Sequence, residues 1–294
     1  LPKTVATAAD GEGRTIAVIG FGGDNAVVHG GGSGSVVPSY IVPPKDAIAA
    51  KVGGNTQVVF DQGTDLGKAT ELAAGADVAI VFVGTLSHEG GDRASLSLDD
   101  GCDTCKGNTH NQNAMVDAVA ATNENTIVVL SVPGAVLMPW STHPNVTAIV
   151  MGFLAGQQVG NAIADVLFGD VNPSGRLPLT MPNKENEMEM SAEQWPGLPD
   201  TSKPDFAIYS EQLLVGYRWY EAKQVQFTTG FPFGHGLSYT SFGYSNINVD
   251  EKERTVSFDL QNMGGVTGDE VAQLYIGFPE VAGDPPLQLK GFQK

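Results

Sequence analysis

Basic residues and cysteines are scarce in this 294-residue chain, and it has no long apolar run. Its 16 Lys and Arg are outnumbered by 33 Asp and Glu, which gives a formal net charge of −17. Nucleic acids and anionic lipid surfaces both bind clusters of Lys and Arg, so neither partner is expected. No apolar run approaches the ~20 residues that cross a bilayer, so no membrane segment is expected either.

The two cysteines, Cys102 and Cys105, lie in a polar Cys-Asp-Thr-Cys stretch. Two thiolates cannot complete a zinc site, and the five histidines offer no second pair at ligand spacing, so we expect no metal and no other cofactor. A redox motif of the thioredoxin type would begin a helix directly after a strand. We therefore predict a Cys102–Cys105 disulfide in a tight turn. Together with the glycosylation sequon at Asn145, it indicates a secreted or extracellular protein.

Residues 1–182 alternate apolar runs with amphipathic patterns, which is typical of βα units around a parallel sheet. Continuous apolar runs fit strands that are covered on both faces. The expected strands are 15–19, 57–60, 77–83, 126–130 and 147–151. The expected helices are 44–50, 66–74, 113–122 and 158–168, the last ending at Gly169. The pattern predicts an α/β domain with a mainly parallel sheet sandwiched by helices.

Regular periodicity is lost over 183–241, which we interpret as a linker or wrap that contains some short structure. From 242 onward the apolar residues alternate with period two, and strands are expected at 242–247, 255–260 and 271–276. These predict the N-terminal part of an all-β sandwich of the immunoglobulin or fibronectin type III kind over 242–294. Because such a sandwich needs about 100 residues, we expect the chain to stop inside this domain.

Two glycine-rich segments approach nucleotide-binding motifs without completing them. The segment 30–35 (Gly-Gly-Gly-Ser-Gly-Ser) has no Gly-Lys-Ser/Thr and no helix directly after it. The segment 20–25 lacks the third glycine of a dinucleotide fingerprint. We interpret both as backbone that turns sharply or lies close to another surface.

The segment 87–93 (Ser-His-Glu-Gly-Gly-Asp-Arg) concentrates charge where the most apolar strand ends. Ligand sites of open α/β sheets gather at this edge. If Asp92 stays paired with Arg93, Glu89 is available as an acid or base. The alternative is a surface loop stabilised by an Asp92–Arg93 ion pair, and the residues alone leave both open.

This loop resembles the acid/base loop of family 3 glycoside hydrolases, the β-glucosidase family. Five further stretches resemble the same family, so that the resemblance covers nearly the whole chain. They lie at 156–170, 172–178, 214–220 (Leu-Val-Gly-Tyr-Arg-Trp-Tyr), 231–239 (Phe-Pro-Phe-Gly-His-Gly-Leu-Ser-Tyr) and 268–275.

The resemblance implies a retaining hydrolase of terminal β-linked sugars, most often a β-glucosidase, with Glu89 as acid/base and Asp92 and Arg93 beside it. In this family the nucleophile and most sugar-binding groups belong to an N-terminal (β/α)₈ barrel, which does not precede Leu1 here. We therefore expect no nucleophile in this chain, a barrel partner in cis or as a separate chain, and no activity of the chain alone. The alternative is a non-catalytic extracellular module with a structural or carbohydrate-associated role.

Two further expectations concern the irregular segment. Trp195 and Trp219 could stack on sugar rings, but aromatic side chains in such segments more often pack onto the fold, which we favour here. Glu211 and Arg218 are expected to form an internal ion pair.

Overall fold

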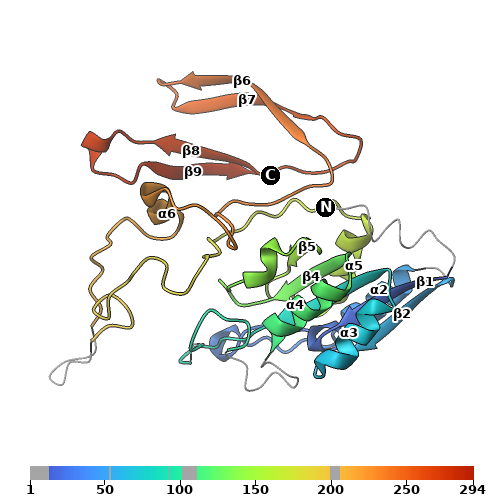
Figure 1. Ribbon diagram of the computed structural model, residues 1–294. Helices are drawn as coiled ribbons and strands as arrows, with labels where there is room; N and C mark the ends of the chain where they lie inside the picture. The colour runs from blue at the N-terminus through green and yellow to red at the C-terminus, as the bar shows by residue number, and fades with distance from the viewer. Residues whose placement is uncertain (1–12, 53, 92, 101–110, 199–205) are drawn as a thin grey trace.

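A computed structural model describes residues 13–52, 54–91, 93–100, 111–198 and 206–294. A five-stranded parallel sheet with helices comes first in the chain, and two antiparallel strand pairs come last (Figure 1). An irregular segment with one short helix, α6 (Tyr217–Lys223), lies between them. The predicted fold class, an α/β sheet followed by β-structure, is confirmed.

The strand order of the parallel sheet is β2-β1-β3-β4-β5. The strands are β1 (Arg14–Ile19), β2 (Thr56–Asp61), β3 (Val78–Gly84), β4 (Thr126–Ser131) and β5 (Val146–Met151). The chain runs from β1 outward to β2 and then returns to β3 on the other side of β1. The order therefore reverses between β1 and β3, and the loops that leave these two neighbouring strands emerge side by side at one edge.

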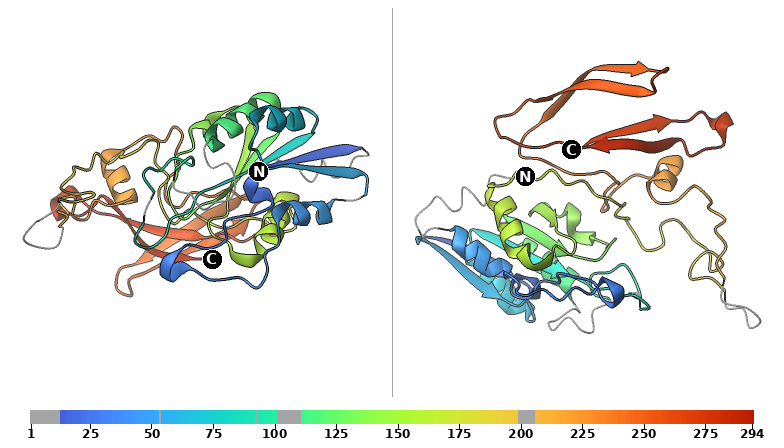
Figure 2. Two further views of the ribbon diagram at one scale, coloured as in Figure 1. Left: turned by 90° about the horizontal axis from the view of Figure 1, so that it is seen from below. Right: turned by 180° about the vertical axis from the view of Figure 1, so that it is seen from behind.

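Helices cover both faces of the sheet, as the view from below shows (Figure 2, left). On one face α2 (Pro44–Lys51) and α5 (Val159–Phe168) pack over alternate strand residues such as Val18 and Ile80. On the other face α3 (Leu66–Ala74) and α4 (Gln112–Thr122) pack over the intervening ones, such as Ile19 and Val81. Burial on two faces is why the strands read as unbroken apolar runs.

The helix ends follow from local chemistry. The Asp65 carboxylate accepts hydrogen bonds from the N–H groups of Gly67 and Lys68 and so caps α3. Gly169 ends α5, as predicted, in the left-handed conformation at φ 82°. Of the helices in the described part of the chain, none combines the length and apolar character needed to cross a membrane.

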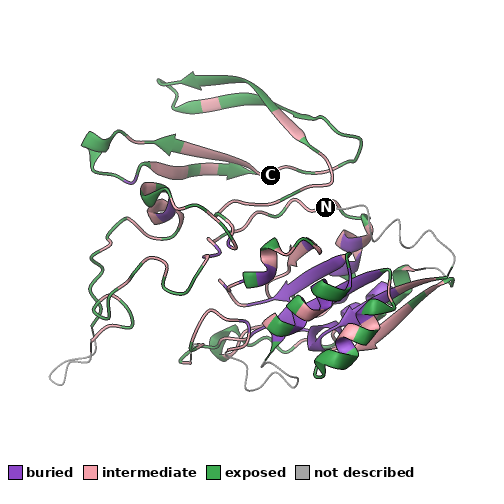
Figure 3. Cartoon of the chain, in the orientation of Figure 1, coloured by how far each residue is buried: buried purple, intermediate pink, exposed green. Residues whose placement is uncertain are grey.

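The strand pairs near the C-terminus are β6 (Phe242–Asp250) with β7 (Thr255–Asn262), and β8 (Ala272–Gly277) with β9 (Leu287–Gln293). Strand β9 was not predicted. Strands β6 and β7 are mostly solvent-exposed, and β8 and β9 are mostly of intermediate burial, in contrast to the buried centre of the parallel sheet (Figure 3). The short 3₁₀ turns are η1 (Phe21–Gly23), η2 (Gly32–Gly34), η3 (Pro139–Thr142), η4 (Gly156–Gln158) and η5 (Glu280–Ala282).

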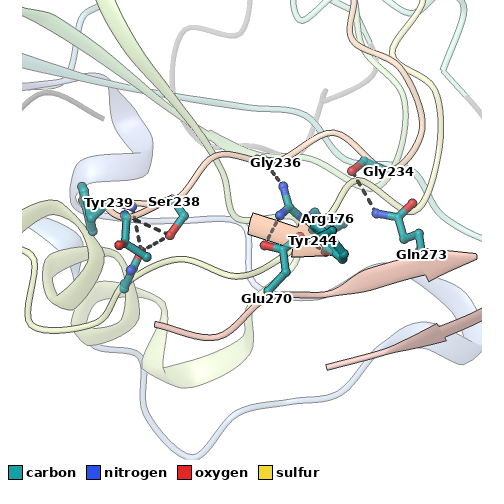
Figure 4. A network of polar contacts seen from close by, with 10 residues as sticks. Arg176, Gly234, Gly236, Ser238, Tyr239, Tyr244, Glu270 and Gln273 are labelled. Atoms are coloured by element: carbon teal, nitrogen blue, oxygen red, sulfur yellow. Dashed lines mark hydrogen bonds and ion pairs between the residues drawn. The ribbon is translucent and has the colours of Figure 1, made fainter. Parts of the chain in front are cut away.

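A polar network joins the segment after α5 to the strand pairs (Figure 4). The Arg176 guanidinium forms an ion pair with Glu270 (2.5 Å) and donates a hydrogen bond to the Gly236 carbonyl. Glu270 also accepts the Tyr244 hydroxyl at 3.0 Å, and the Gln273 amide donates to the Gly234 carbonyl at 3.2 Å. Because Arg176 and Glu270 are both largely buried, the pair is a specific connection between the two parts.

The irregular segment is closed at its base. Met181 and Phe231 exchange two backbone hydrogen bonds, of 2.9 and 3.0 Å. Beside them the Asn183 side-chain oxygen accepts the N–H groups of Thr228 (2.7 Å), Thr229 (3.1 Å) and Gly230 (3.1 Å). The two ends of the irregular segment therefore lie together, next to the sheet domain.

Candidate active-site loop

The candidate loop begins where the fully buried strand β3 ends at Gly84. His88 and Gly91 form a tight turn through two backbone hydrogen bonds, of 3.1 and 3.3 Å, and Glu89 is exposed within it. The loop lies at the carboxyl edge of the sheet, next to the point where the strand order reverses. It therefore occupies the position where open α/β sheets bind ligands.

The glycine-rich turn η2 follows β1 and lies directly against this loop. Gly31 forms a parallel bridge with His88. A Cβ atom on Gly31 would lie 2.4 Å from the His88 Cβ, and one on Gly32 would lie 2.4 Å from the Glu89 Cβ. Only glycine fits at both positions, so the predicted close approach to another surface is confirmed, and the surface is the Glu89 loop.

Glu89 is held by Ser33. The Ser33 N–H donates a 2.8 Å hydrogen bond to the Glu89 Oε2. The Ser33 hydroxyl and N–H together lower the pKa of this carboxyl below its ordinary value, and slight desolvation opposes them. In this chain Glu89 is thus an exposed, ionised carboxylate that is oriented by a neighbouring turn.

Arg93 turns inward from the loop, and one of its Nη atoms donates a 3.0 Å hydrogen bond to the Ala135 carbonyl. Asp92, the expected partner of Arg93, lies outside the described residues, so their pairing stays a prediction. The Arg93 contact anchors the end of the loop to the segment that follows β4.

Gln112 was missed by the sequence analysis. It begins α4 and is 1 % exposed. Its side-chain amide accepts the Gly84 N–H at 2.8 Å and donates to the Gly84 and Leu98 carbonyls at 2.9 and 2.5 Å. The Asp99 carboxylate accepts the backbone N–H of Gln112 at 2.6 Å and so caps the helix from a distant segment. Both residues fix the strand end from which the candidate loop departs.

The remaining predicted residues are dispersed. Cys102 and Cys105 lie outside the described residues, so the disulfide stays a prediction. The Asn145 side-chain nitrogen donates a 2.8 Å hydrogen bond to the Ala120 carbonyl. Within the described ranges, no cluster of His, Cys, Asp and Glu could hold a metal ion.

The structure tests the expectations for the two tryptophans and for the ion pair of the irregular segment. Trp219 is half-buried and packs edge-on against Tyr220, whereas Trp195 is 64 % exposed. The predicted Glu211–Arg218 ion pair was wrong, since the described residues show no such pair. The Glu211 carboxylate instead accepts a hydrogen bond from the Gln194 amide at 3.0 Å, so its partner comes from within the irregular segment.

Comparison with known proteins gives one family throughout. The family model described as "Glycosyl hydrolase family 3 C-terminal domain" matches residues 10–239. A probable beta-glucosidase L of Aspergillus terreus is 38% identical over 91% of this chain and 38% of its own length. The thermostable beta-glucosidase B of Acetivibrio thermocellus is 36% identical over 95% of this chain and 37% of its own length. The chain thus spans less than two fifths of these relatives.

Solved structures agree with this assignment. DesR, a beta-glucosidase from Streptomyces venezuelae in complex with D-glucose, superposes with a TM-score of 0.86 at 26% identity, over 98% of this chain and 50% of that one. The beta-D-glucoside glucohydrolase of Trichoderma reesei gives a TM-score of 0.78 at 33% identity, over 96% of this chain and 44% of that one. Since the family model covers well over half of the residues, the chain belongs to glycosyl hydrolase family 3, of which it carries the C-terminal domain.

Proposed function

We propose that this chain supplies Glu89 as the general acid/base of a retaining β-glucosidase whose nucleophile is carried by a separate barrel domain. The observation that carries the proposal is an exposed, oriented carboxylate at the carboxyl edge of the sheet, in a chain of this family. Relatives of the chain are named beta-glucosidases, and one solved neighbour holds D-glucose. The proposed substrates are therefore terminal β-linked glucosides.

Retaining hydrolysis requires two carboxyl groups about 5–5.5 Å apart. In the first step the nucleophile attacks the anomeric carbon while protonated Glu89 transfers its proton to the departing glycosidic oxygen. A covalent glycosyl–enzyme forms, and Glu89 becomes a carboxylate. In the second step Glu89 removes a proton from water, whose oxygen attacks the same carbon and releases the nucleophile and the sugar.

The ionised state of Glu89 in this chain fits the second step, in which the residue is a base. The first step needs the protonated form. A second carboxylate brought close, together with exclusion of water, raises the pKa of such a group. Docking of the nucleophile's domain would therefore convert Glu89 from a base into an acid, and supporting contacts would come from Arg93 and Asp92.

The test is made in the enzyme that contains both this chain and the nucleophile, with an aryl β-glucoside as substrate. Replacing Glu89 with Ala is expected to lower kcat by about 10²–10⁴-fold, the usual contribution of a general acid. Added azide is expected to restore turnover and to give a glycosyl azide of retained configuration. Glu124→Ala, which removes an exposed carboxylate elsewhere on the sheet domain, is the matched control. Full activity of Glu89→Ala would favour the non-catalytic module instead.

We also propose that the protein is secreted, with a Cys102–Cys105 disulfide and a glycan at Asn145. The support is the spacing of the cysteines and the sequon. A glycan would replace one hydrogen of the Asn145 amide, the group that donates to the Ala120 carbonyl. Intact mass of the native polypeptide before and after reduction and deglycosylation tests the disulfide and the glycan, and recovery of the protein from the culture medium of its source cells tests secretion.

A further inference from the structure

Ser33 lies on the turn η2, 56 residues before Glu89, and contacts the Glu89 carboxylate directly. Its backbone N–H donates to the Glu89 Oε2 at 2.8 Å. Its hydroxyl also lowers the pKa of this carboxyl below its ordinary value. One residue of the segment between β1 and α2 therefore holds the proposed acid/base through its backbone N–H and favours the ionised form.

The glycines of this turn permit the contact. Gly32 has a φ of +64°, and a Cβ atom there would lie 2.4 Å from the Glu89 Cβ and 3.0 Å from its Oε2. Gly31 is equally close to His88. A Cβ atom on Gly34, in the same turn, would meet nothing within 4 Å. The need for glycine is thus greatest where the turn touches the Glu89 loop.

The side chains of His29, His88 and Arg93, which lie on or beside the η2 turn and the Glu89 loop, contact backbone carbonyl groups. The His29 Nδ1 is 2.7 Å from the Gly30 carbonyl, and the His88 Nδ1 is 3.1 Å from the Glu89 backbone carbonyl. The Arg93 guanidinium donates to Ala135. Among the groups that the structure describes here, Ser33 is the one whose N–H donates to the Glu89 carboxylate.

We propose that Ser33 is a positioning residue for Glu89, which holds the carboxylate against the η2 turn and stabilises its ionised form. The proposal rests on the function proposed for Glu89. Stabilising the carboxylate favours departure of the proton during the first step, because the donors become stronger as negative charge develops. It also keeps Glu89 available as a base for the second step.

The contact is tested by titrating Glu89 in the 294-residue chain with ¹³C-labelled glutamate, using Glu89→Gln to assign its signal. Ser33→Ala keeps the backbone N–H and removes the hydroxyl that lowers the pKa of Glu89. It is expected to raise that pKa, since the carboxylate loses stabilisation. Ser33→Thr keeps a hydroxyl and is expected to restore the wild-type titration. Gly34→Ala is the matched control in the same turn and is expected to leave it unchanged. A Glu89 titration that is identical in Ser33→Ala and wild type would overturn the proposal.

The catalytic consequence is measured in the enzyme that contains the nucleophile. Ser33→Ala is expected to move the basic limb of the kcat/KM profile to higher pH and to lower kcat by about 10-fold, less than the 10²–10⁴-fold loss from removing a general acid. An unchanged profile in Ser33→Ala, while Glu89→Ala is inactive, would overturn the positioning role. An active Glu89→Ala enzyme would instead refute the proposed function, and the titration would still decide whether Ser33 holds Glu89.

Discussion

Replacing Gln112 with Leu keeps the approximate size of a buried side chain and removes three hydrogen bonds at the end of β3. The partners are the Gly84 N–H and the Gly84 and Leu98 carbonyls, at 2.8, 2.9 and 2.5 Å. Each buried backbone group left without a partner costs about 1–3 kcal/mol. Because neighbouring effects are not additive, we expect a total loss of about 3–6 kcal/mol in the free energy of unfolding.

The isosteric variant Gln112→Glu separates hydrogen bonding from packing. Its carboxylate still accepts the Gly84 N–H, but it faces the two carbonyl oxygens that the amide formerly bound. Burial and these oxygens raise the pKa of the new carboxyl above its unfolded value of about 4.3. A group with a raised folded pKa stabilises the fold below the unfolded pKa and loses that contribution as pH rises. The free energy of unfolding of this variant is therefore expected to approach the wild-type value in acid and to lie well below it at neutral pH.

Urea denaturation followed by circular dichroism gives both quantities, provided that the m-value is unchanged. Gln158→Leu is the matched control, because the Gln158 side chain is exposed and, among the described residues, hydrogen-bonds the side chains of Tyr40 and Asn161. It is expected to change stability by less than about 0.5 kcal/mol. A loss below about 1 kcal/mol in Gln112→Leu would show that the amide is not the anchor of β3. So would a pH-independent deficit in Gln112→Glu.

Three further outcomes are expected. Arg176→Met leaves the largely buried Glu270 carboxylate without its guanidinium partner. It is expected to lower the free energy of unfolding, measured by thermal denaturation, by about 2–4 kcal/mol. An unchanged stability would contradict the connection between the two parts. Burial, and then the charge of Arg176, lower the pKa of His235. The free energy of unfolding is therefore expected to fall as pH drops below the unfolded pKa of about 6.5. His235→Phe should remove that part of the pH dependence in urea titrations. The purified chain is expected not to hydrolyse an aryl β-glucoside above background, because one carboxyl alone cannot form the covalent intermediate; turnover lost in Glu89→Gln would refute this.

The sheet was predictable because each of its strands is covered on both faces. Val78–Gly84 is buried at all seven positions, so its apolar run has no polar interruption. Strand β9 lies in an open pair, where Gln288 and Lys290 alternate with Leu287 and Leu289 and Gly291 interrupts the pattern. A half-exposed strand of that kind gives a much weaker signal in the sequence.

The sequence predicted the candidate loop but not Ser33, the residue that contacts Glu89 in it. Charge gathered after the most apolar run is a local feature that identified the loop, and the family resemblance then singled out Glu89 within it. Ser33 contacts Glu89 because β1 and β3 are neighbours in the sheet. The order of strands in a sheet cannot be predicted from a local sequence pattern. Gln112 was missed for the same reason, since its partners, Gly84 and Leu98, lie 28 and 14 residues away. The glycines of η2 were the available signal, and they indicated a close approach without naming the surface.

The closed base of the irregular segment has a consequence for how this part of the protein can change. The Met181–Phe231 bridge and the Asn183 side chain hold the two ends of the segment together. Closing a loop of twice the length costs only about 0.6 kcal/mol more, so residues could be inserted within 191–215, before α6, with little penalty. The route from the sheet to the strand pairs would stay the same. Length variation among homologous chains, and even a cut backbone, should therefore be tolerated in this excursion while the Arg176–Glu270 connection persists.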